Sequence, residues 1–311
     1  MEKTLKQKRS RAQVKQEIIC WVQSILMLLL VLVVLYPLIY CFFGAFNTNE
    51  QYRTSGILPI AIPWDPSTIR NFYVLYTVSD VWVSIFMTFI KFFYYAVLGT
   101  LISVIAGYFF GKVSFFGKRA LFLYFMISMM IPSISMMVPS YVILVRFPLV
   151  GGNNILGSGG SGFLNNPAIF FVNGLFSAYN VFLVKQSMQT IDTAYRESAE
   201  MDGAGVLTVI FRIYFPLVKP VVAVMIIGLF LGTWNDYLFS LIYLPDLEMF
   251  HTIGTKIIEV INTLNMTDIS PTPNYPLVFG ISLSSMIPPV IVFLVFQKQF
   301  VSGLTMGGLK G

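Results

Sequence analysis

Six long apolar stretches constrain the fold of this chain more than any other feature. A helix needs about 20 mostly apolar residues to cross the hydrocarbon core of a membrane. Six windows meet this requirement: Ile18–Phe46, Ile85–Gly111, Ala120–Val145, Pro167–Lys185, Val221–Leu244 and Leu277–Phe296. Only 11% of the 311 residues are charged, and a soluble fold of this size could not bury so much apolar surface in one core. The sequence therefore predicts an all-α polytopic membrane protein with six transmembrane helices.

Lysine and arginine are distributed unevenly between the connecting segments, and this distribution predicts the orientation. The first 15 residues carry six of them, immediately before the first apolar window. With the N-terminus inside, the cytoplasmic segments hold fifteen Lys and Arg and the outer loops hold four. Because basic residues accumulate on the cytoplasmic side, both termini are predicted there. The net charge of +6 is then explained by the membrane surface, and no nucleic-acid partner is expected.

Apart from Lys185 at the end of the fourth window, two charged residues lie within the apolar windows. Lys91 is close to the start of the second window and beside Tyr94 and Tyr95, so it is predicted to snorkel to the outer interface. Asp236 is the one carboxylate well inside a window. It belongs either to a hydrogen-bonded structural cluster or to an ion or proton path. The sequence shows no chain of further groups for a relay.

A Gly-, Ser- and Asn-rich stretch, Gly151–Asn166, is expected to form an irregular, exposed outer loop. It is interpreted either as a flexible connector or as a surface that meets an external partner.

The segment between the fourth and fifth windows has the pattern of a small helical hairpin. Asp192 can cap a short helix, Arg196 and Glu200 can pair at i,i+4, and Gly203 can end the helix in a left-handed turn. A short apolar stretch follows, and Pro220 is predicted to open the next membrane helix. Such a hairpin on the cytoplasmic face is suited to passing force between a soluble partner and the membrane helices; the alternative is a plain loop.

The hairpin resembles the EAA loop of ABC importer permeases. The resemblance rests on Glu197-Ser198-Ala199, on Gly203 and on Phe215-Pro216. Ser198 stands where the family usually has Ala, and Phe215 where it often has Leu. The motif Thr233-Trp234-Asn235-Asp236-Tyr237 and the ending Gly303–Gly311 are similar to the carbohydrate branch, specifically to the shorter maltose-type permease subunit.

The resemblance implies a type I ABC importer permease fold in a prokaryotic cell membrane. It divides the chain into a basic cytoplasmic N-terminus (residues 1–17) and a single transmembrane permease domain (18–311). Within that domain it places a core at about 82–297, an EAA coupling loop at 187–219 and a cytoplasmic tail at 298–311. The implied partners are a second homologous permease subunit, a cytoplasmic ATPase dimer, an extracytoplasmic solute-binding protein and the lipid bilayer.

The resemblance also implies roles for individual residues. Glu197, Ala199, Gly203 and Pro216 would shape the element that docks on the ATPase. Arg196 and Asp202 are candidates for polar contacts with it. ATP and Mg²⁺ would be bound by the partner, because this chain has no GxxxxGK[ST] phosphate loop. No cofactor is therefore expected here.

Trp234, Asn235 and Tyr237 are candidates for the substrate path, because sugars are held by aromatic faces and amides. The function predicted is the permease subunit of an ATP-driven, binding-protein-dependent oligosaccharide importer. Two alternatives stay open: a permease of the same kind for a non-sugar solute, and an ion-coupled secondary carrier with Asp236 as its relay. No enzyme or metal site is expected, because the single His251 and the scattered carboxylates form no catalytic or ligand constellation.

Overall fold

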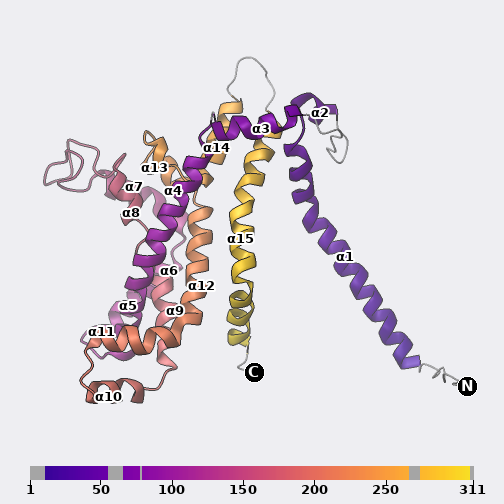
Figure 1. The fold of residues 1–311 in the computed structure, drawn as a ribbon. Coiled ribbons are helices and arrows are strands. Elements are labelled where there is room, and N and C mark those ends of the chain that lie inside the picture. The colour runs from indigo at the N-terminus through magenta and orange to yellow at the C-terminus, as the bar shows by residue number, and fades with distance from the viewer. Residues whose placement is uncertain (1–10, 55–65, 78, 266–273, 309–311) are drawn as a thin grey trace, which may run out of the picture. The chain divides into compact units, whose positions relative to one another are not determined.

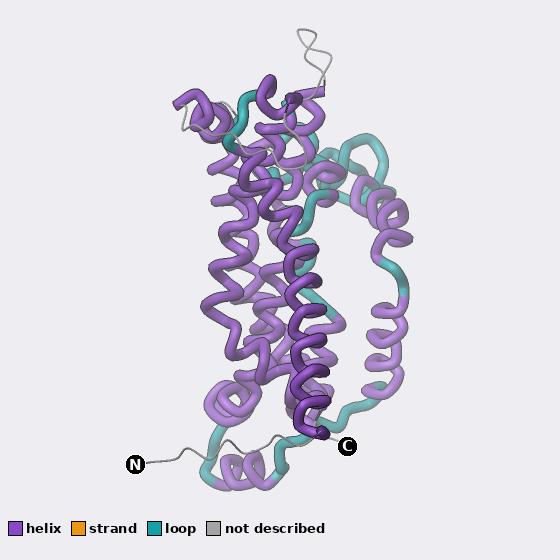
Figure 2. The backbone as a smooth tube through the Cα atoms, turned by 90° about the vertical axis from the view of Figure 1, so that its right-hand side faces the viewer, coloured by secondary structure: helices purple, strands orange, loops and turns teal. Residues whose placement is uncertain are grey.

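The regular structure of this protein is helical throughout the part of the chain that the computed structural model describes, residues 11–54, 66–77, 79–265 and 274–308 (Figure 1, Figure 2). The chain divides into two compact units. One comprises residues 1–75 and 272–284, and the other comprises residues 76–271 and 285–311.

The first unit contains α1 (Arg11–Ala45), α2 (Asn49–Thr54), nearly all of α3 (Pro66–Thr77) and the start of α15 (Tyr275–Gly308). Residues 16–39 of α1 are all exposed, as expected of a helix that faces lipid or another subunit. Near its end, the ring of Phe279 lies edge-on to Tyr40 with centroids 5.7 Å apart. Gly44 makes this approach possible, because a Cβ there would lie 2.6 Å from the Phe279 ring.

The second unit holds the remaining helices in chain order. They are α4 (Val81–Tyr94), the π-helix η1 (Tyr95–Gly99), α5 (Thr100–Lys112), α6 (Lys118–Met130), the 3₁₀-helix η2 (Ser133–Met136), α7 (Met137–Val145), α8 (Pro167–Val172), α9 (Ala178–Gln189), α10 (Ala194–Met201), α11 (Val206–Thr208), the π-helix η3 (Val209–Tyr214), α12 (Phe215–Trp234), α13 (Leu238–Tyr243), the 3₁₀-helix η4 (Glu248–Phe250), α14 (Ile253–Asn265) and the rest of α15. In Figure 1, α10 lies at the lower end of this unit, and α13 and α14 lie at the upper end.

Four helical segments of the described chain are long and apolar enough to cross a membrane, and a bent pair raises the number to five. The four are Gln16–Ala45, Val81–Lys112, Val206–Trp234 and Tyr275–Gln297. The pair is the third predicted window, which bends by 100° between Met130 and Ser133. The fourth predicted window is not one helix, because Asn173–Ser177 separates α8 from α9. A polytopic helical membrane protein is therefore confirmed, whereas the number six is carried forward as a proposal.

The start predicted for the fifth membrane helix is wrong. Pro220 lies inside α12, and Pro216 is the second residue of that helix. The helical span runs without interruption from Val206 through the π turn of η3 to Trp234. A proline inside a helix removes one backbone hydrogen bond, and the long apolar span continues through the two losses at Pro216 and Pro220. The fifth window also ends earlier than predicted, at Trp234, because Asn235–Tyr237 breaks the helix.

The core of the second unit is a cluster of buried side chains between α5, α9, η3 and α12. It includes Tyr108, Met188 and Tyr214, each at most 2% exposed. The helices α5 and α9 approach closely at Gly107, where a Cβ would lie 2.6 Å from Val184 Cγ1. The same cluster extends under α10, because Ala199 and Ala204 pack against it.

The glycine-rich stretch at residues 151–166 is irregular and mostly exposed, as predicted, but it is internally structured. The Asn153 side chain is 7% exposed, donates to the carbonyl oxygens of Val145 and Phe147, and accepts from the backbone N–H of Gly160. Farther on, Asn165 donates to the Asp246 carboxylate at 2.5 Å. The loop is therefore held against the segment that follows α13.

Candidate functional site

The first candidate site is the hairpin around α10, which we call the coupling hairpin (residues 192–216). The cap position of α10 is Thr193, one residue later than predicted, and its side chain makes no capping bond. Asp192 Oδ1 instead accepts a hydrogen bond from the backbone N–H of Ala194, the first residue of the helix, at 3.0 Å. The predicted pair between Arg196 and Glu200 is present at 3.3 Å. Gly203 has φ of +79°, the left-handed conformation expected after the helix. These local features are all encoded in one short stretch of sequence.

Two contacts fasten the coupling hairpin to the end of α5. The guanidinium of Arg196 donates to the carbonyl oxygen of Lys112 at 3.1 Å. In turn, the ammonium of Lys112 donates to the carbonyl oxygen of Ile191, just before the hairpin begins. Arg196 is a candidate for polar contacts with an ATPase, and this stays a prediction; within this chain its guanidinium already contacts Lys112 and Glu200. In the sequence analysis Lys112 is only one of the fifteen basic residues of the predicted cytoplasmic segments. Nothing in its local sequence pattern indicates this anchoring role.

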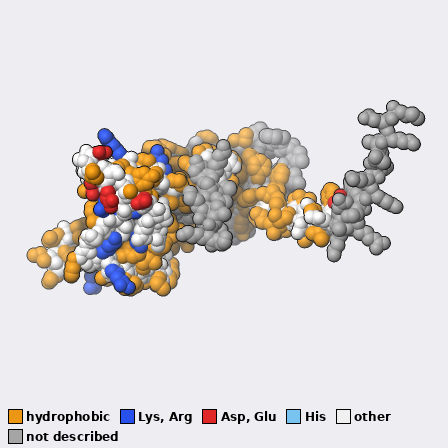
Figure 3. Space-filling view, turned by 90° about the horizontal axis from the view of Figure 1, so that it is seen from below, with side chains coloured by type: hydrophobic (Ala, Val, Ile, Leu, Met, Phe, Trp, Pro, Cys, Tyr) orange, Lys and Arg blue, Asp and Glu red, His pale blue; other side chains and the backbone are white. Residues whose placement is uncertain are grey.

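The outer face of the coupling hairpin is uncovered and partly apolar. Tyr195 is 56% exposed, Leu207 63% and Met201 89%. Glu197 and Asp202 are also exposed, and Pro216 is exposed at the start of α12. Acidic and basic side chains lie around apolar ones on this end of the unit (Figure 3). Exposed apolar side chains with a polar rim are typical of a protein interaction surface.

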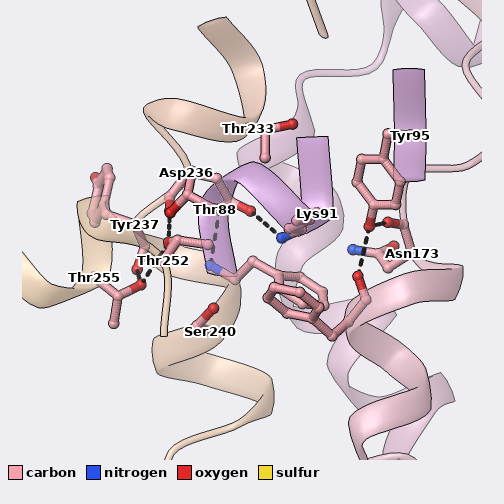
Figure 4. Close-up of polar contacts among 12 residues, drawn as sticks. Thr88, Lys91, Tyr95, Asn173, Thr233, Asp236, Tyr237, Ser240, Thr252 and Thr255 are labelled. Carbon is pink, nitrogen blue, oxygen red and sulfur yellow. Dashed lines mark hydrogen bonds and ion pairs between the residues drawn. The ribbon is translucent and has the colours of Figure 1, made fainter. Parts of the chain in front are cut away.

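The second candidate site is the helix break at Asn235–Tyr237, which we call the polar break (Figure 4). Lys91 Nζ forms an ion pair with Asp236 Oδ2 at 2.9 Å. The other carboxylate oxygen accepts a hydrogen bond from the backbone N–H of Phe239, near the start of α13, at 3.2 Å. The prediction that Lys91 snorkels to the interface is wrong. The residue is 2% exposed, because Asp236, 145 positions later in the chain, supplies its counter-charge.

Further contacts bind the polar break to α4 and α14. The hydroxyl of Thr252 donates to the carbonyl oxygen of Asp236 at 2.5 Å, and that of Thr255 donates to the carbonyl oxygen of Tyr237 at 2.9 Å. The start of α14 is itself joined to α4, because the backbone N–H of Ile253 donates to Thr88 Oγ1 at 2.9 Å. The ammonium of Lys91 also lies 4.1 Å from the centroid of the Phe239 ring. Carbonyl groups that the helix break leaves without helical partners are therefore satisfied from neighbouring elements.

A cavity of about 510 Å³ adjoins the polar break. Its walls come from α4, η1, the α8–α9 break, α9 and α12. Its polar lining comes from Lys91, Tyr95, Asn173, Ser177, Tyr179, Asn180, Thr233 and Asp236. The hydroxyl of Tyr95 donates to the carbonyl oxygen of Phe170 at 3.0 Å and also contacts the carbonyl oxygen of Asn173. These two contacts position the break between α8 and α9. Sequence reasoning missed this cavity, although the turn-forming pair Asn173-Gly174 inside an apolar window was a usable signal.

The structure brings the three predicted substrate-path residues together on a different groove. Trp234, Asn235 and Tyr237 line a hollow of about 470 Å³ with parts of α14 and α15. Trp234 is 5% exposed, its indole N–H donates to the carbonyl oxygen of Ser285 at 3.0 Å, and its ring stacks on Phe230. Of the three, Asn235 and Tyr237 are exposed.

The fold and these two sites define a class: a multi-span helical membrane protein with a polar cavity among broken helices and an exposed hairpin. Residues 99–306, more than half of the chain, match the family of binding-protein-dependent transport system inner membrane components. The chain belongs to this family. It is therefore a transport subunit of an inner membrane, not an enzyme, and it carries no cofactor of its own.

Curated relatives and a solved structure agree with this assignment. The arabinooligosaccharides transport system permease protein AraQ of Halalkalibacterium halodurans is 26% identical over 94% of this chain and 98% of that protein. The maltodextrin transport system permease protein MdxG of Bacillus subtilis is 30% identical over 69% of this chain and 70% of that protein. A chain of a bacterial ABC transporter involved in alginate import has a TM-score of 0.75 at 23% identity, over 94% of this chain and 99% of that chain, and so shares the fold.

Proposed function

We propose that this protein is one of two transmembrane subunits of an ATP-driven, binding-protein-dependent importer of oligosaccharides. Its family supplies the transport role, and relatives along most of the chain bear the names of arabinooligosaccharide and maltodextrin permeases. The observation that carries the mechanism is the coupling hairpin, which is anchored to the end of α5 through Lys112 and Arg196.

The proposed topology has six spans, with both termini in the cytoplasm. The bent pair α6–α7 would form the third span, and the broken pair α8–α9 the fourth. The excess of fifteen Lys and Arg over four supports this orientation. It places the coupling hairpin inside the cell, where an ATPase dimer that binds ATP and Mg²⁺ can reach it. We retain residues 18–311 as the permease domain, after a basic N-terminus at 1–17.

The coupling hairpin would dock on the ATPase through its exposed face, with Glu197, Ala199, Asp202 and Gly203 shaping the docking element. Movement of the ATPase would pass to α5 through the Lys112 and Arg196 contacts. It would pass to α9 and α12 through the packed cluster around Tyr108 and Tyr214. A hairpin held at several points transmits displacement better than a loop held only at its ends.

The cavity beside the polar break is the proposed part of the substrate path that this subunit contributes. Tyrosine faces, amides and hydroxyls can hold the C–H faces and hydroxyl groups of a sugar. The one cation among its lining residues is Lys91, and Asp236 cancels its charge. The cavity therefore suits an uncharged saccharide. The ion pair also weakens the alternative of an ion-coupled carrier, because Asp236 is already engaged as a structural counter-ion.

A matched pair of tyrosine variants distinguishes the cavity from the groove of Trp234, Asn235 and Tyr237. Tyr179 is 54% exposed in the cavity and Tyr237 is 46% exposed in the groove. We expect Tyr179→Ala to raise the KM for uptake by about three- to tenfold, the value of a lost aromatic contact. Tyr237→Ala should change it by less than about twofold on the same scale. The opposite ranking would transfer the substrate path to the groove.

The proposal is tested by reconstituting the chain with its partner permease, ATPase subunits and binding protein in liposomes. Uptake of arabinooligosaccharide or maltodextrin should require ATP and should survive an uncoupler. Glu197→Lys and Gly203→Pro should insert normally, yet lose uptake and bind the ATPase more weakly. Uptake that survives ATP depletion and collapses with an uncoupler would instead indicate an ion-coupled carrier. A binding protein that is thermally stabilised by amino acids or polyamines, and not by saccharides, would indicate a non-sugar solute.

A further inference from the structure

A recess near the coupling hairpin carries a concentration of positive charge that transport does not explain. It has a volume of about 600 Å³ and lies between the end of α5, the start of α6 and α9. Lys118 and Arg119 enter it from the first turn of α6, and Lys185 enters it from α9. No carboxylate is among its lining residues. We call it the basic recess.

Two of the three cations of the basic recess are held in place without an acidic partner. Lys185 Nζ lies 4.0 Å from the centroid of the Phe122 ring. Lys118 Nζ donates to the carbonyl oxygen of Val113 at 2.7 Å. None of the ion pairs found among the described residues involves Lys118, Arg119 or Lys185. Their mutual repulsion would be relieved by a bound anion.

The start of α6 adds to this positive potential. The helix has 13 residues, and its cap position is Gly117, with φ of +76° and no side chain to cap the helix. Among the first N–H groups, that of Lys118 donates to the carbonyl oxygen of Phe115 at 3.3 Å. Its first turn contains no acidic residue. A helix N-terminus of this kind attracts phosphate groups, because unsatisfied N–H groups and the helix dipole both favour negative charge.

Apolar side chains border the basic recess. Phe110, Phe115 and Phe122 line it. Phe116, in the connection before α6, is 105% exposed. In the proposed orientation, this connection leaves the membrane on the cytoplasmic side. Exposed aromatic side chains beside lysine and arginine are typical of the headgroup level of a bilayer, and anionic lipids are concentrated in the cytoplasmic leaflet.

We propose that the basic recess binds the phosphate headgroup of an anionic phospholipid. The phosphate would lie between Lys118, Arg119 and Lys185, and the acyl chains would extend past the phenylalanine side chains into the membrane. Because α6 packs against α9 here and Gln189 at the edge of the recess is three residues from Asp192, the lipid would brace the base of the coupling hairpin. This inference goes beyond the proposed transport function and takes only its orientation from it.

The test is native mass spectrometry of the full importer complex, titrated in detergent with phosphatidylglycerol or with phosphatidylcholine of the same acyl chains. We expect tighter binding of phosphatidylglycerol. The single variants Lys118→Gln and Lys185→Gln should each weaken it by about fivefold, because one basic residue near an anionic lipid contributes about 1 kcal/mol. The matched control is Lys219→Gln, which removes an exposed cation of α12 outside the recess. It should leave the preference unchanged.

Three results would overturn the proposal. The first is equal loss of binding in Lys219→Gln and in the recess variants. The second is displacement of the lipid by millimolar inorganic phosphate, which would identify a site for a soluble anion. The third is retention of phosphatidylglycerol only when the ATPase subunits are absent, which would identify the recess as part of the ATPase interface. Lipid binding needs no transport, so a failure of the saccharide assay would leave this test unaffected.

Discussion

The coupling hairpin and the polar break hold their shape in different ways. The hairpin is built from local signals: a hydrogen bond from the first N–H of α10 to Asp192, an i,i+4 pair and a glycine at φ +79°. The polar break depends on a partner 145 positions away, because Asp236 is balanced by Lys91. The hairpin faces outward with apolar side chains exposed, whereas Lys91 is 2% exposed. The shape of the exposed hairpin is thus specified by local signals, with long-range contacts only anchoring it to Lys112, whereas the polar break is specified by long-range pairing.

The largest effect should come from removing one partner of the Lys91–Asp236 ion pair in the polar break. Asp236→Ala leaves a buried ammonium without a counter-charge, which should cost about 3–5 kcal/mol of stability. Replacing both partners, as in Lys91→Met with Asp236→Leu, should cost much less. Thermal unfolding of the purified protein in detergent measures both. If the double variant is as unstable as the single one, the pair is not the element that holds the break.

The close contact between α5 and α9 near the coupling hairpin should be sensitive to the addition of a single methyl group. In Gly107→Ala, the new Cβ would lie 2.6 Å from Val184 Cγ1, and overpacking of this kind costs about 1–3 kcal/mol. Gly111→Ala is the matched control, because its nearest neighbour would be at 3.4 Å. Melting temperatures of the two variants should differ clearly. Equal values would contradict a tight contact between α5 and α9.

The turn of the coupling hairpin should lose function more than stability. Gly203→Ala places a side chain at φ +79°, with nothing within 4 Å, so the cost is backbone strain of about 1–2 kcal/mol. Gly205→Ala also enters open space but has an ordinary φ of −72°. Stimulation of the ATPase by loaded binding protein should fall for the first variant and persist for the second. An equal loss of ATPase stimulation in both variants would indicate that the added side chains disturb the exposed surface of the hairpin, and not that the backbone conformation at Gly203 is required.

A smaller, pH-dependent effect is expected at the opposite end of the second unit. His251 is buried between the Leu244 carbonyl oxygen, 2.8 Å from Nε2, and the carboxylate of Glu259, which Lys256 also contacts at 3.1 Å. Burial lowers the pKa of His251, but the hydrogen bonds to Glu259 and Leu244 outweigh it and raise the pKa above 6.5. Burial raises the pKa of Glu259, and its bonds to His251 and Lys256 bring it below 4.5.

The sign of this dependence follows from the two directions. The His251 contribution is complete below pH 6.5 and is lost as the pH rises through its raised pKa. The Glu259 contribution is complete above pH 4.5 and is lost as the pH falls through its lowered pKa. The free energy of local opening of α14 should therefore fall by about 1 kcal/mol between pH 6 and pH 8.5. Amide hydrogen exchange measures this fall, after correction for the intrinsic effect of pH on exchange. His251→Gln should remove this difference. If the pH dependence of α14 exchange were unchanged in His251→Gln, a titratable group other than His251 would be responsible for it.

The helical membrane fold and the coupling hairpin could be predicted from the sequence because both are written in short-range patterns. Apolar windows of the right length predicted a polytopic helical membrane protein, though not the breaks within the third and fourth windows, and Arg196, Glu200 and Gly203 predicted the hairpin. The contact between Lys91 and Asp236 could not be predicted, because pairing across 145 residues leaves no local trace. The break at Asn173 was visible as a turn-forming pair, yet its apolar surroundings made one continuous helix the simpler interpretation.

The most direct test of coupling through the hairpin is site-specific photocrosslinking in the assembled complex. A photoreactive benzoylphenylalanine would replace Met201, which is 89% exposed on the hairpin, or Phe116, which is fully exposed on the same end of the unit. If the hairpin docks on the ATPase, the probe at position 201 should crosslink to the ATPase subunit, with a yield that changes between ATP-bound and nucleotide-free states. The probe at position 116 should crosslink to lipid. No adduct at position 201, or an equal ATPase adduct at both positions, would contradict the account.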